Sequence, residues 1–331
     1  MSDHLPRTQQ DLIGHAEAEQ QMLQAMESGR LPHAWLLTGS EGVGKATLAY
    51  RFARFLLSGK RHGKDLSVPL SDSAAKLVAA GSHPDMLVIE RVFDEKKGRL
   101  LQDIPVESVR DIAGFLHLTS SQSGMRVVIV DGAAALNRHG QNALLKILEE
   151  PPENSLIILT CESAGMLLPT IRSRCRVVKL SALSADQLRL IAQRSDVKIE
   201  GQALDFLIDI AEGSAARLFR YAENDAPQLY QSWQSFVNTP SDRLARLKLA
   251  ESCSGRDAEE TFLTFRDIVF LWLRRAITAR AKGAGGDVPV ERLLFLWETL
   301  REKARAADDS NLDRKAALLD MLNDAAGIFA A

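Results

Sequence analysis

The stretch Gly39-Ser40-Glu41-Gly42-Val43-Gly44-Lys45-Ala46 follows the GxxxxGK pattern of a phosphate-binding loop. The apolar residues Ala34-Trp35-Leu36-Leu37 precede it as a predicted buried strand, and an apolar helix from Thr47 to Leu57 follows. A glycine-rich turn between a strand and a helix presents backbone N–H groups and the positive end of the helix dipole to phosphate oxygens. A turn without chemical role is the alternative, and the flanking strand and helix favour the phosphate loop.

The residues predicted from this stretch to form a nucleotide site are Gly39, Gly42, Gly44, Lys45, Ala46 and Thr47. Lys45 would reach the β- and γ-phosphates, and a Ser or Thr directly after it would normally bind Mg²⁺. Ala46 stands there instead and has no oxygen to offer. Thr47 lies roughly 100° further around the helix, so we expect its hydroxyl to point elsewhere.

An acid follows a second apolar strand. Val127–Val130 ends at Asp131, about ninety residues after the phosphate loop, where a P-loop ATPase carries its Mg²⁺-associated acid. Many parallel strands end in an acid, so Asp131 alone is a weak signal. Gly132 stands where an active ATPase usually carries a second acid, which polarises the attacking water. The combination predicts a site that binds ATP or ADP without hydrolysing it and that holds Mg²⁺ poorly.

Strand and helix patterns alternate over the first part of the chain. The predicted strands are Ala34–Leu37, Met86–Ile89, Val127–Val130, Leu156–Thr160 and Val177–Leu180, and the helices between them include Val106–Leu116 and Gly140–Glu150. Alternation of this kind predicts a parallel sheet with helices on both faces, and therefore an α/β P-loop domain, which we assign to residues 1–180.

After Leu180 the pattern is helical throughout. Ser184-Ala185-Asp186-Gln187 is a capping box at the start of a helix, and further helices are predicted at Ala203–Ala211 and Ala215–Glu223. Asn238-Thr239-Pro240 interrupts the pattern. We therefore expect a small all-α domain at 181–240 and a second all-α domain at 241–331, in which most apolar stripes pack a core and some form an oligomer interface.

Composition limits the class of protein. The 331 residues are 46% hydrophobic and 25% charged with a net charge of −2, which is typical of a soluble protein of two or three domains and argues against a strongly basic nucleic-acid binder. No apolar run approaches the ~20 residues of a membrane span, and Met1–His4 does not resemble a signal peptide. The cysteines Cys161, Cys175 and Cys253 form no CxxC pair. We expect a cytoplasmic location, no membrane contact and no metal site, zinc included.

Several further segments resemble a known family. Asn142–Pro152 (NALLKILEEPP) and Ser173-Arg174-Cys175 are similar to the signature of bacterial sliding-clamp loader subunits, which belong to the AAA+ class and to DNA polymerase III. Arg30–Ala34, Ser82–Asp85 and Asn311–Asp313 match the same family, so the resemblance covers nearly the whole chain. The eleven-residue segment is highly specific, whereas the tripeptide alone would be weak.

The resemblance implies an AAA+ module, a helical lid at 181–240 and a helical collar at 241–331. It also implies a ring-like pentamer with motor subunits (gamma/tau) and a clamp-opening delta subunit, which acts on the sliding clamp and on primed DNA. Such a chain is a component of the DNA-directed DNA polymerase holoenzyme during replication. The degraded ATPase motifs favour a stator-type subunit, without turnover of its own, over a motor.

In this family the arginine at the position of Arg174 acts in trans, as an arginine finger in the ATP site of the adjacent motor. The alternative is a surface or interface ion pair. For Cys175 a small buried thiol without chemical role is favoured. Family members that hold zinc carry four cysteines after the first helix of the ATPase domain, and the corresponding stretch Ser58–Ser82 has none.

Two other family positions match less well. The polar residue that senses the γ-phosphate would fall near Thr160-Cys161. The lid arginine is Arg217, one position later than in motor subunits, and we include it in the predicted degenerate nucleotide site.

Three rival functions remain open on sequence alone. An active AAA+ ATPase, either a motor clamp-loader subunit or a helicase-like protein, would have to tolerate Ala46 and Gly132. A nucleotide kinase would use the same loop but would need an arginine-rich substrate lid. A pure scaffold would leave Arg174 without a catalytic role.

Overall fold

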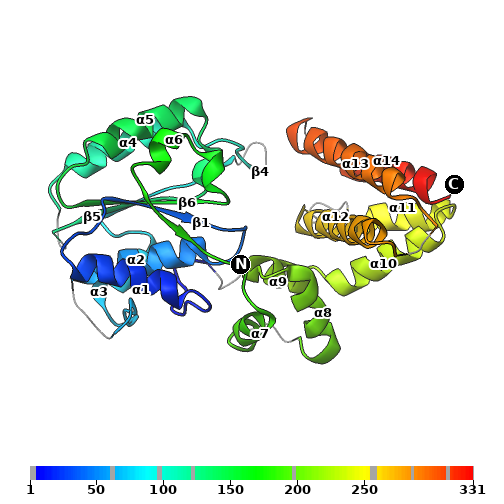
Figure 1. Cartoon of the computed structure of the whole chain (residues 1–331), viewed down its shortest axis with the longest axis horizontal. Helices are drawn as coiled ribbons and strands as arrows, with labels where there is room; N and C mark the ends of the chain where they lie inside the picture. The colour runs from blue at the N-terminus through cyan, green and yellow to red at the C-terminus, as the bar shows by residue number, and fades with distance from the viewer. Residues whose placement is uncertain are drawn as a thin grey trace. The chain divides into compact units, whose positions relative to one another are not determined.

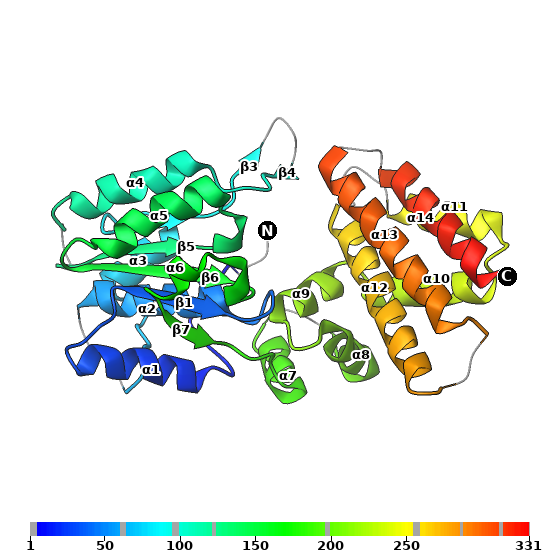
Figure 2. The same cartoon turned by 45° about the horizontal axis from the view of Figure 1, so that its top comes forward.

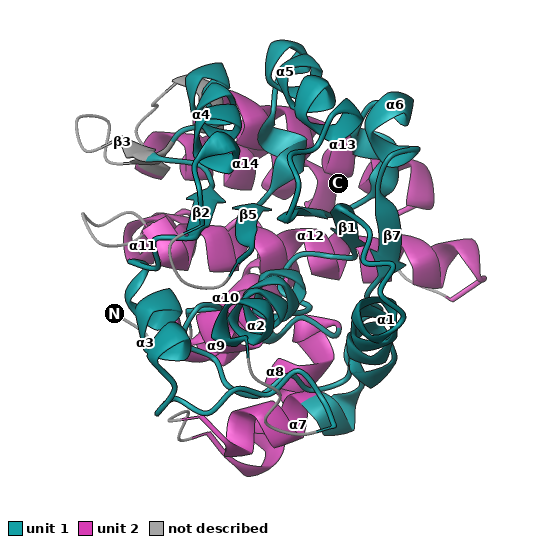
Figure 3. Cartoon of the chain, turned by 90° about the vertical axis from the view of Figure 1, so that its left-hand side faces the viewer, with its two compact units in different colours: residues 1–187, 213–215 teal, residues 188–212, 216–331 magenta. Residues whose placement is uncertain are grey.

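The computed structural model describes residues 5–59, 64–94, 99–120, 124–195, 199–253, 259–284, 287–310 and 314–330. The family segment Asn311–Asp313 lies outside them. The chain divides into two compact units, residues 1–187 with 213–215, and residues 188–212 with 216–331 (Figure 3). In the described residues, no helix is long and apolar enough to cross a membrane.

The first unit is built on a five-stranded parallel sheet. Its strands are β1 (Ala34–Thr38), β2 (Met86–Ile89), β5 (Arg126–Val130), β6 (Ser155–Cys161) and β7 (Arg176–Lys179), in the order β2-β5-β6-β1-β7. Each predicted strand is confirmed to within one or two residues. β1, β5 and β6 are buried along their whole length, which explains why they read as continuous apolar runs and not as alternating ones.

Helices cover both faces of this sheet, as predicted (Figures 1 and 2). α1 (Ala16–Glu27), α2 (Lys45–Ser58) and α3 (Ser73–Ala80) pack on one face, with Trp35 and Leu37. α4 (Val106–His117), α5 (Arg138–Glu149) and α6 (Pro169–Arg172) pack on the other, with Ala34 and Leu36. Neighbouring residues of β1 thus pack into the cores on opposite faces of the sheet, as the two-residue period of a strand requires. A small antiparallel pair, β3 (Phe93–Asp94) with β4 (Arg99–Leu100), was not predicted.

From α7 onward every element that the structure describes is an α-helix. These are α7 (Ala185–Gln193), α8 (Gly201–Ala211), α9 (Ala215–Glu223), α10 (Ala226–Asn238), α11 (Arg243–Ser252), α12 (Glu259–Ala281), α13 (Val290–Ser310) and α14 (Arg314–Phe329). The predicted capping box of α7 is confirmed: Gln187 N–H donates to Ser184 Oγ at 3.2 Å, and Ser184 N–H donates to Gln187 Oε1 at 2.9 Å.

Helix α10 was not predicted as a separate helix. Its Trp233 is fully buried and meets Phe265 and Trp272 of α12 and Phe329 of α14 edge-on, with ring centroids 5.8 to 6.1 Å apart. Such aromatic contacts add to the free energy gained from the buried area alone. This packing joins a helix of the predicted lid range to helices of the predicted collar range, and the domain boundaries themselves remain predictions.

Candidate nucleotide site and arginine finger

The predicted phosphate loop lies between the end of β1 and the start of α2. Gly44 caps α2 with φ 108°, a backbone conformation that favours glycine. A side chain at Gly39 would place its Cβ 2.4 Å from the carbonyl oxygen of Leu180, so only glycine fits there. Among the described residues, no acceptor lies within hydrogen-bond reach of the backbone N–H groups of residues 40–44. Free N–H groups beside a helix N-terminus have the chemistry that binds phosphate oxygens.

Lys45 is held over its own loop. Its Nζ donates to the carbonyl oxygens of Gly39 at 2.7 Å and Ser40 at 2.8 Å. An ammonium group has three N–H donors, so one remains for a phosphate oxygen. Burial lowers the pKa of Lys45, and the charges of Glu162 and Asp131 oppose that shift.

The first helical turn offers no metal ligand next to this lysine. Ala46 packs against the core of the first unit, and the half-buried Thr47 is the next residue along α2. The loop N–H groups and Lys45 therefore have the chemistry that binds phosphate oxygens, and position 46 lacks the hydroxyl that usually binds Mg²⁺.

Asp131 is engaged by a residue of the neighbouring strand. β5 pairs with β6 so that Val130 lies opposite Leu159, which brings Asp131 next to Thr160. The Thr160 hydroxyl donates to Asp131 Oδ1 at 2.5 Å and accepts the N–H of Gly132 at 2.9 Å. The γ-phosphate position was predicted near Thr160-Cys161, and here the hydroxyl of Thr160 donates its hydrogen to Asp131.

A second carboxylate lies at the same edge, and sequence reasoning missed it. β2 pairs with β5 so that Ile89 lies opposite Val130, and Glu90 therefore follows beside Asp131. Desolvation and the charge of Asp131 raise the pKa of Glu90. Burial, Glu90 and Asp131 together raise the pKa of Tyr50, on α2, to about 12. The signal was available, because Glu90 directly follows a predicted strand.

Two backbone carbonyls of the loop accept hydrogen bonds from residues outside it, and no sequence signal predicted either bond. The buried His15 donates from Nε2 to the Val43 carbonyl at 2.6 Å, and burial lowers the pKa of its imidazole. The Ala215 N–H, at the start of α9, donates to the Gly42 carbonyl at 3.0 Å. The conformation of the loop thus depends on segments before and after it in the chain.

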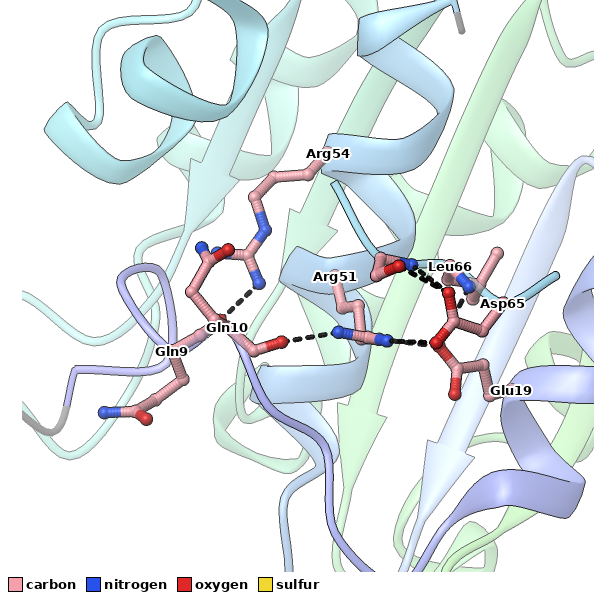
Figure 4. Close-up of polar contacts among 8 residues, drawn as sticks. Gln9, Gln10, Glu19, Arg51, Arg54, Asp65 and Leu66 are labelled. Carbon is pink, nitrogen blue, oxygen red and sulfur yellow. Dashed lines mark hydrogen bonds and ion pairs between the residues drawn. The ribbon is translucent and has the colours of Figure 1, made fainter. Parts of the chain in front are cut away.

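Two buried arginines of α2 fasten the N-terminal segment that leads to His15 (Figure 4). Arg51 pairs with Glu19 of α1 at 2.6 Å and donates to the Gln10 carbonyl at 2.5 Å. Arg54, one turn later, donates to the Gln9 carbonyl. Because buried guanidinium groups need acceptors on every side, these bonds fix the segment against α2.

Arg174 follows α6, with its side chain 35% exposed. Its Nη2 lies 2.9 Å from Glu149 Oε1 at the end of α5, and its Nη1 donates to the Thr170 carbonyl at 3.0 Å. An ion pair, the alternative role considered for Arg174, is therefore present within the chain. For Cys175, burial raises the pKa of the thiol to about 12, in line with a thiol that does not react.

The family segment on α5 and the segment that carries Arg174 are held together by hydrogen bonds. Gln141 of α5 donates from Nε2 to the Leu136 carbonyl at 3.0 Å and accepts the Leu168 N–H at 2.9 Å, which fixes the start of α6 on α5. His33 lies 3.2 Å from the Leu148 carbonyl in the last turn of α5. Glu149 of NALLKILEEPP pairs with Arg174, and Gln141, the residue just before that stretch, fixes the start of α6, the helix that precedes Arg174.

Two further predicted positions have local partners of their own. In the segment Ser82–Asp85, His83 Nδ1 accepts the Asp85 N–H at 3.1 Å just before β2, which places the segment at the strand's start. Arg217 belongs to the second unit, where its Nη1 lies 3.9 Å from Glu212 Oε2. Its part in a nucleotide site remains a prediction.

Known proteins similar to this chain agree with the resemblance. The family model described as "DNA polymerase III, delta subunit" matches residues 14–184. The chain is 32% identical over 271 residues to the DNA polymerase III subunit delta' of Pseudomonas aeruginosa, across 80% of each chain. It is 30% identical to subunit delta' of Yersinia pestis, across 72% of this chain and 69% of that one. Similarity to subunit tau of Escherichia coli, at 30% identity, spans 63% of this chain and 31% of that protein.

The similarity to delta' subunits extends along more of both chains than the similarity to tau does. The stator-type role that Ala46 and Gly132 predict remains a prediction. The chain belongs to the delta' subunit family of the DNA polymerase III clamp loader.

Proposed function

We propose that this chain acts as the stator of a sliding-clamp loader, in the cytoplasm. It assembles with motor subunits of the gamma/tau type and with a delta subunit, and assists the ATP-driven loading of the sliding clamp onto primed DNA. Membership of the delta' family supports the assembly. The catalytic contribution of the chain is to a neighbour's ATP site, not to its own.

The exposure and anchoring of Arg174 carry this proposal. The guanidinium is half-exposed at the end of α6 and makes two contacts, through Nη1 and Nη2. A guanidinium has five N–H donors, so others remain for the γ-phosphate oxygens of an ATP bound to the adjacent motor. A finger supplied in this way stabilises the charge that spreads over the transferring phosphoryl group, and is worth roughly 10³–10⁵ in rate in well-studied enzymes.

The site within the chain itself supports a role without turnover. ATP or ADP would be held by the loop N–H groups and the remaining donor of Lys45. Bound nucleotide would join the loop to the start of α2, because its phosphates would contact both the loop N–H groups and Lys45. Ala46 and Gly132 leave the site without its usual hydroxyl ligand for Mg²⁺ and without the acid that usually polarises water at position 132, so hydrolysis there is not expected.

The proposal is tested by clamp loading. A complex of motor, delta and this chain would be reconstituted with wild type or Arg174→Ala, checked for equal assembly, and assayed for loading a labelled clamp onto primed DNA. We expect normal assembly and slower loading with Arg174→Ala. Equal loading would reduce the chain to a scaffold.

A further inference from the structure

The carboxylate of Glu149 lies at the last residue of α5, 2.9 Å from the Nη2 of Arg174. We propose that Glu149 is a positioning residue for the arginine finger: it fixes the plane of the guanidinium, so that the remaining N–H donors meet the γ-phosphate of the neighbouring motor. This inference rests on the proposed function of Arg174. Glu149 itself touches neither ATP nor water in this account.

The geometry provides two anchors on different elements. Nη2 is held by a side chain from α5, and Nη1 by the backbone carbonyl of Thr170 in α6. The guanidinium is planar, so bonds to both terminal nitrogens fix its orientation as well as its position. With the Thr170 contact alone, the group could still swing about the bonds of a long flexible side chain.

The backbone that carries the finger is fixed by the same helix. Gln141 joins α5 to the start of α6 through the Leu168 N–H. The Arg174 N–H donates to the Ile171 carbonyl at 3.1 Å, which continues the turn of α6. The backbone is anchored in this way, so Glu149 acts on the side chain of Arg174 alone. That side chain can still rotate about its own bonds.

The exposure of the pair limits its role to positioning. Side-chain exposure is 35% for Arg174 and 49% for Glu149, and ion pairs of this exposure add little to folding stability. Removal of the Glu149 charge should therefore leave the fold and the assembly intact. Its effect should appear in catalysis, because small displacements of a transition-state contact cost rate.

The test compares Glu149→Gln with Glu150→Gln in the reconstituted complex, with DNA- and clamp-stimulated ATP hydrolysis as readout. Glutamine keeps the size and removes the charge. Glu150 is the next residue, exposed, and among the described residues it forms no ion pair. We expect Glu149→Gln to reduce, by about twofold or more, the part of the stimulated kcat that Arg174→Ala abolishes, with the KM for ATP unchanged. Glu150→Gln should match wild type.

A double variant separates positioning from other effects. If Glu149 acts through Arg174, then Glu149→Gln combined with Arg174→Ala should hydrolyse ATP at the rate of Arg174→Ala alone. A further loss in the double variant would show that Glu149 acts independently. A wild-type or faster rate for Glu149→Gln, or failure of the folded variant to assemble, would likewise overturn the inference. If Arg174→Ala itself has no effect, it is the proposed function that fails.

Discussion

The hydroxyl of Thr160 donates a 2.5 Å hydrogen bond to the carboxylate of Asp131, and it accepts the backbone N–H of Gly132 at 2.9 Å. One oxygen of the acid predicted to associate with Mg²⁺ is thus already held by the protein. Gly132, which stands in place of the second acid, is part of the same network. The carboxyl edge of the sheet is therefore organised around internal hydrogen bonds.

We predict that the isolated chain binds nucleotide independently of Mg²⁺. Binding of a fluorescent ATP analogue should be equally tight in Mg²⁺ and in EDTA, because Ala46 supplies no metal ligand. Lys45→Ala removes a charged hydrogen bond to phosphate, worth about 1.5–3 kcal/mol, and should weaken binding by roughly 10- to 100-fold.

Ala46→Thr is the matched variant for this measurement, because it restores the usual ligand and should make binding depend on Mg²⁺. ATP hydrolysis by the purified wild-type chain that Lys45→Ala abolishes would contradict the stator account. It would favour an active ATPase instead.

Thr160→Val should destabilise the first unit by about 1–3 kcal/mol, because it leaves the Gly132 N–H and the Asp131 carboxylate without their buried partner. Urea denaturation measures the difference. Thr160→Ser keeps the hydroxyl and should cost only about 0.8 kcal/mol for the lost methyl group. Equal losses in the two variants would mean that the hydrogen bonds contribute nothing.

The sequence predicted β1, β5 and β6 because buried parallel strands are continuous apolar runs, and it predicted Ala215–Glu223 to the residue. It could not predict the bond between Thr160 and Asp131, which depends on the register of two strands. The contact of Glu149 with Arg174 likewise joins residues far apart in the chain. Local patterns specify elements, whereas such contacts arise only from packing. Helix α10 was missed although its sequence carries local helix signals: a proline in its first turn, and apolar residues at helical spacing that become buried, Ala226, Leu229, Trp233 and Phe236.

Arg51→Met should cost about 3–5 kcal/mol, since it leaves the buried carboxylate of Glu19 without its positive partner. Arg110→Met is the control. Arg110 and Glu107 are 70% and 73% exposed at 4.0 Å, so its loss should cost less than about 1 kcal/mol. Chemical denaturation of both variants provides the comparison. Similar values for the two would exclude Arg51 as the anchor of the N-terminal segment.

Stability should fall as the pH drops below 6.5, the ordinary pKa of histidine. Burial lowers the folded-state pKa of His15 and His83, so below 6.5 the unfolded chain binds more protons than the folded one. The loss continues until the pH reaches the folded-state values. His15→Gln keeps a donor for the Val43 carbonyl and should make the decline shallower, as urea denaturation at pH 7.5 and 5.5 would show. An unchanged slope would exclude His15 as a contributor.

The most direct test is DNA- and clamp-stimulated ATP hydrolysis by motor and delta subunits reconstituted with this chain, as wild type, Arg174→Ala or Arg174→Lys. Arg176→Ala, an exposed arginine two positions on, is the control. At equal assembly, the account predicts that Arg174→Ala loses a substantial part of the stimulated rate. Lysine should restore little of it, since it lacks the planar fork, and Arg176→Ala should match wild type. Equal rates for Arg174→Ala and wild type would contradict the central claim that this subunit supplies a finger in trans.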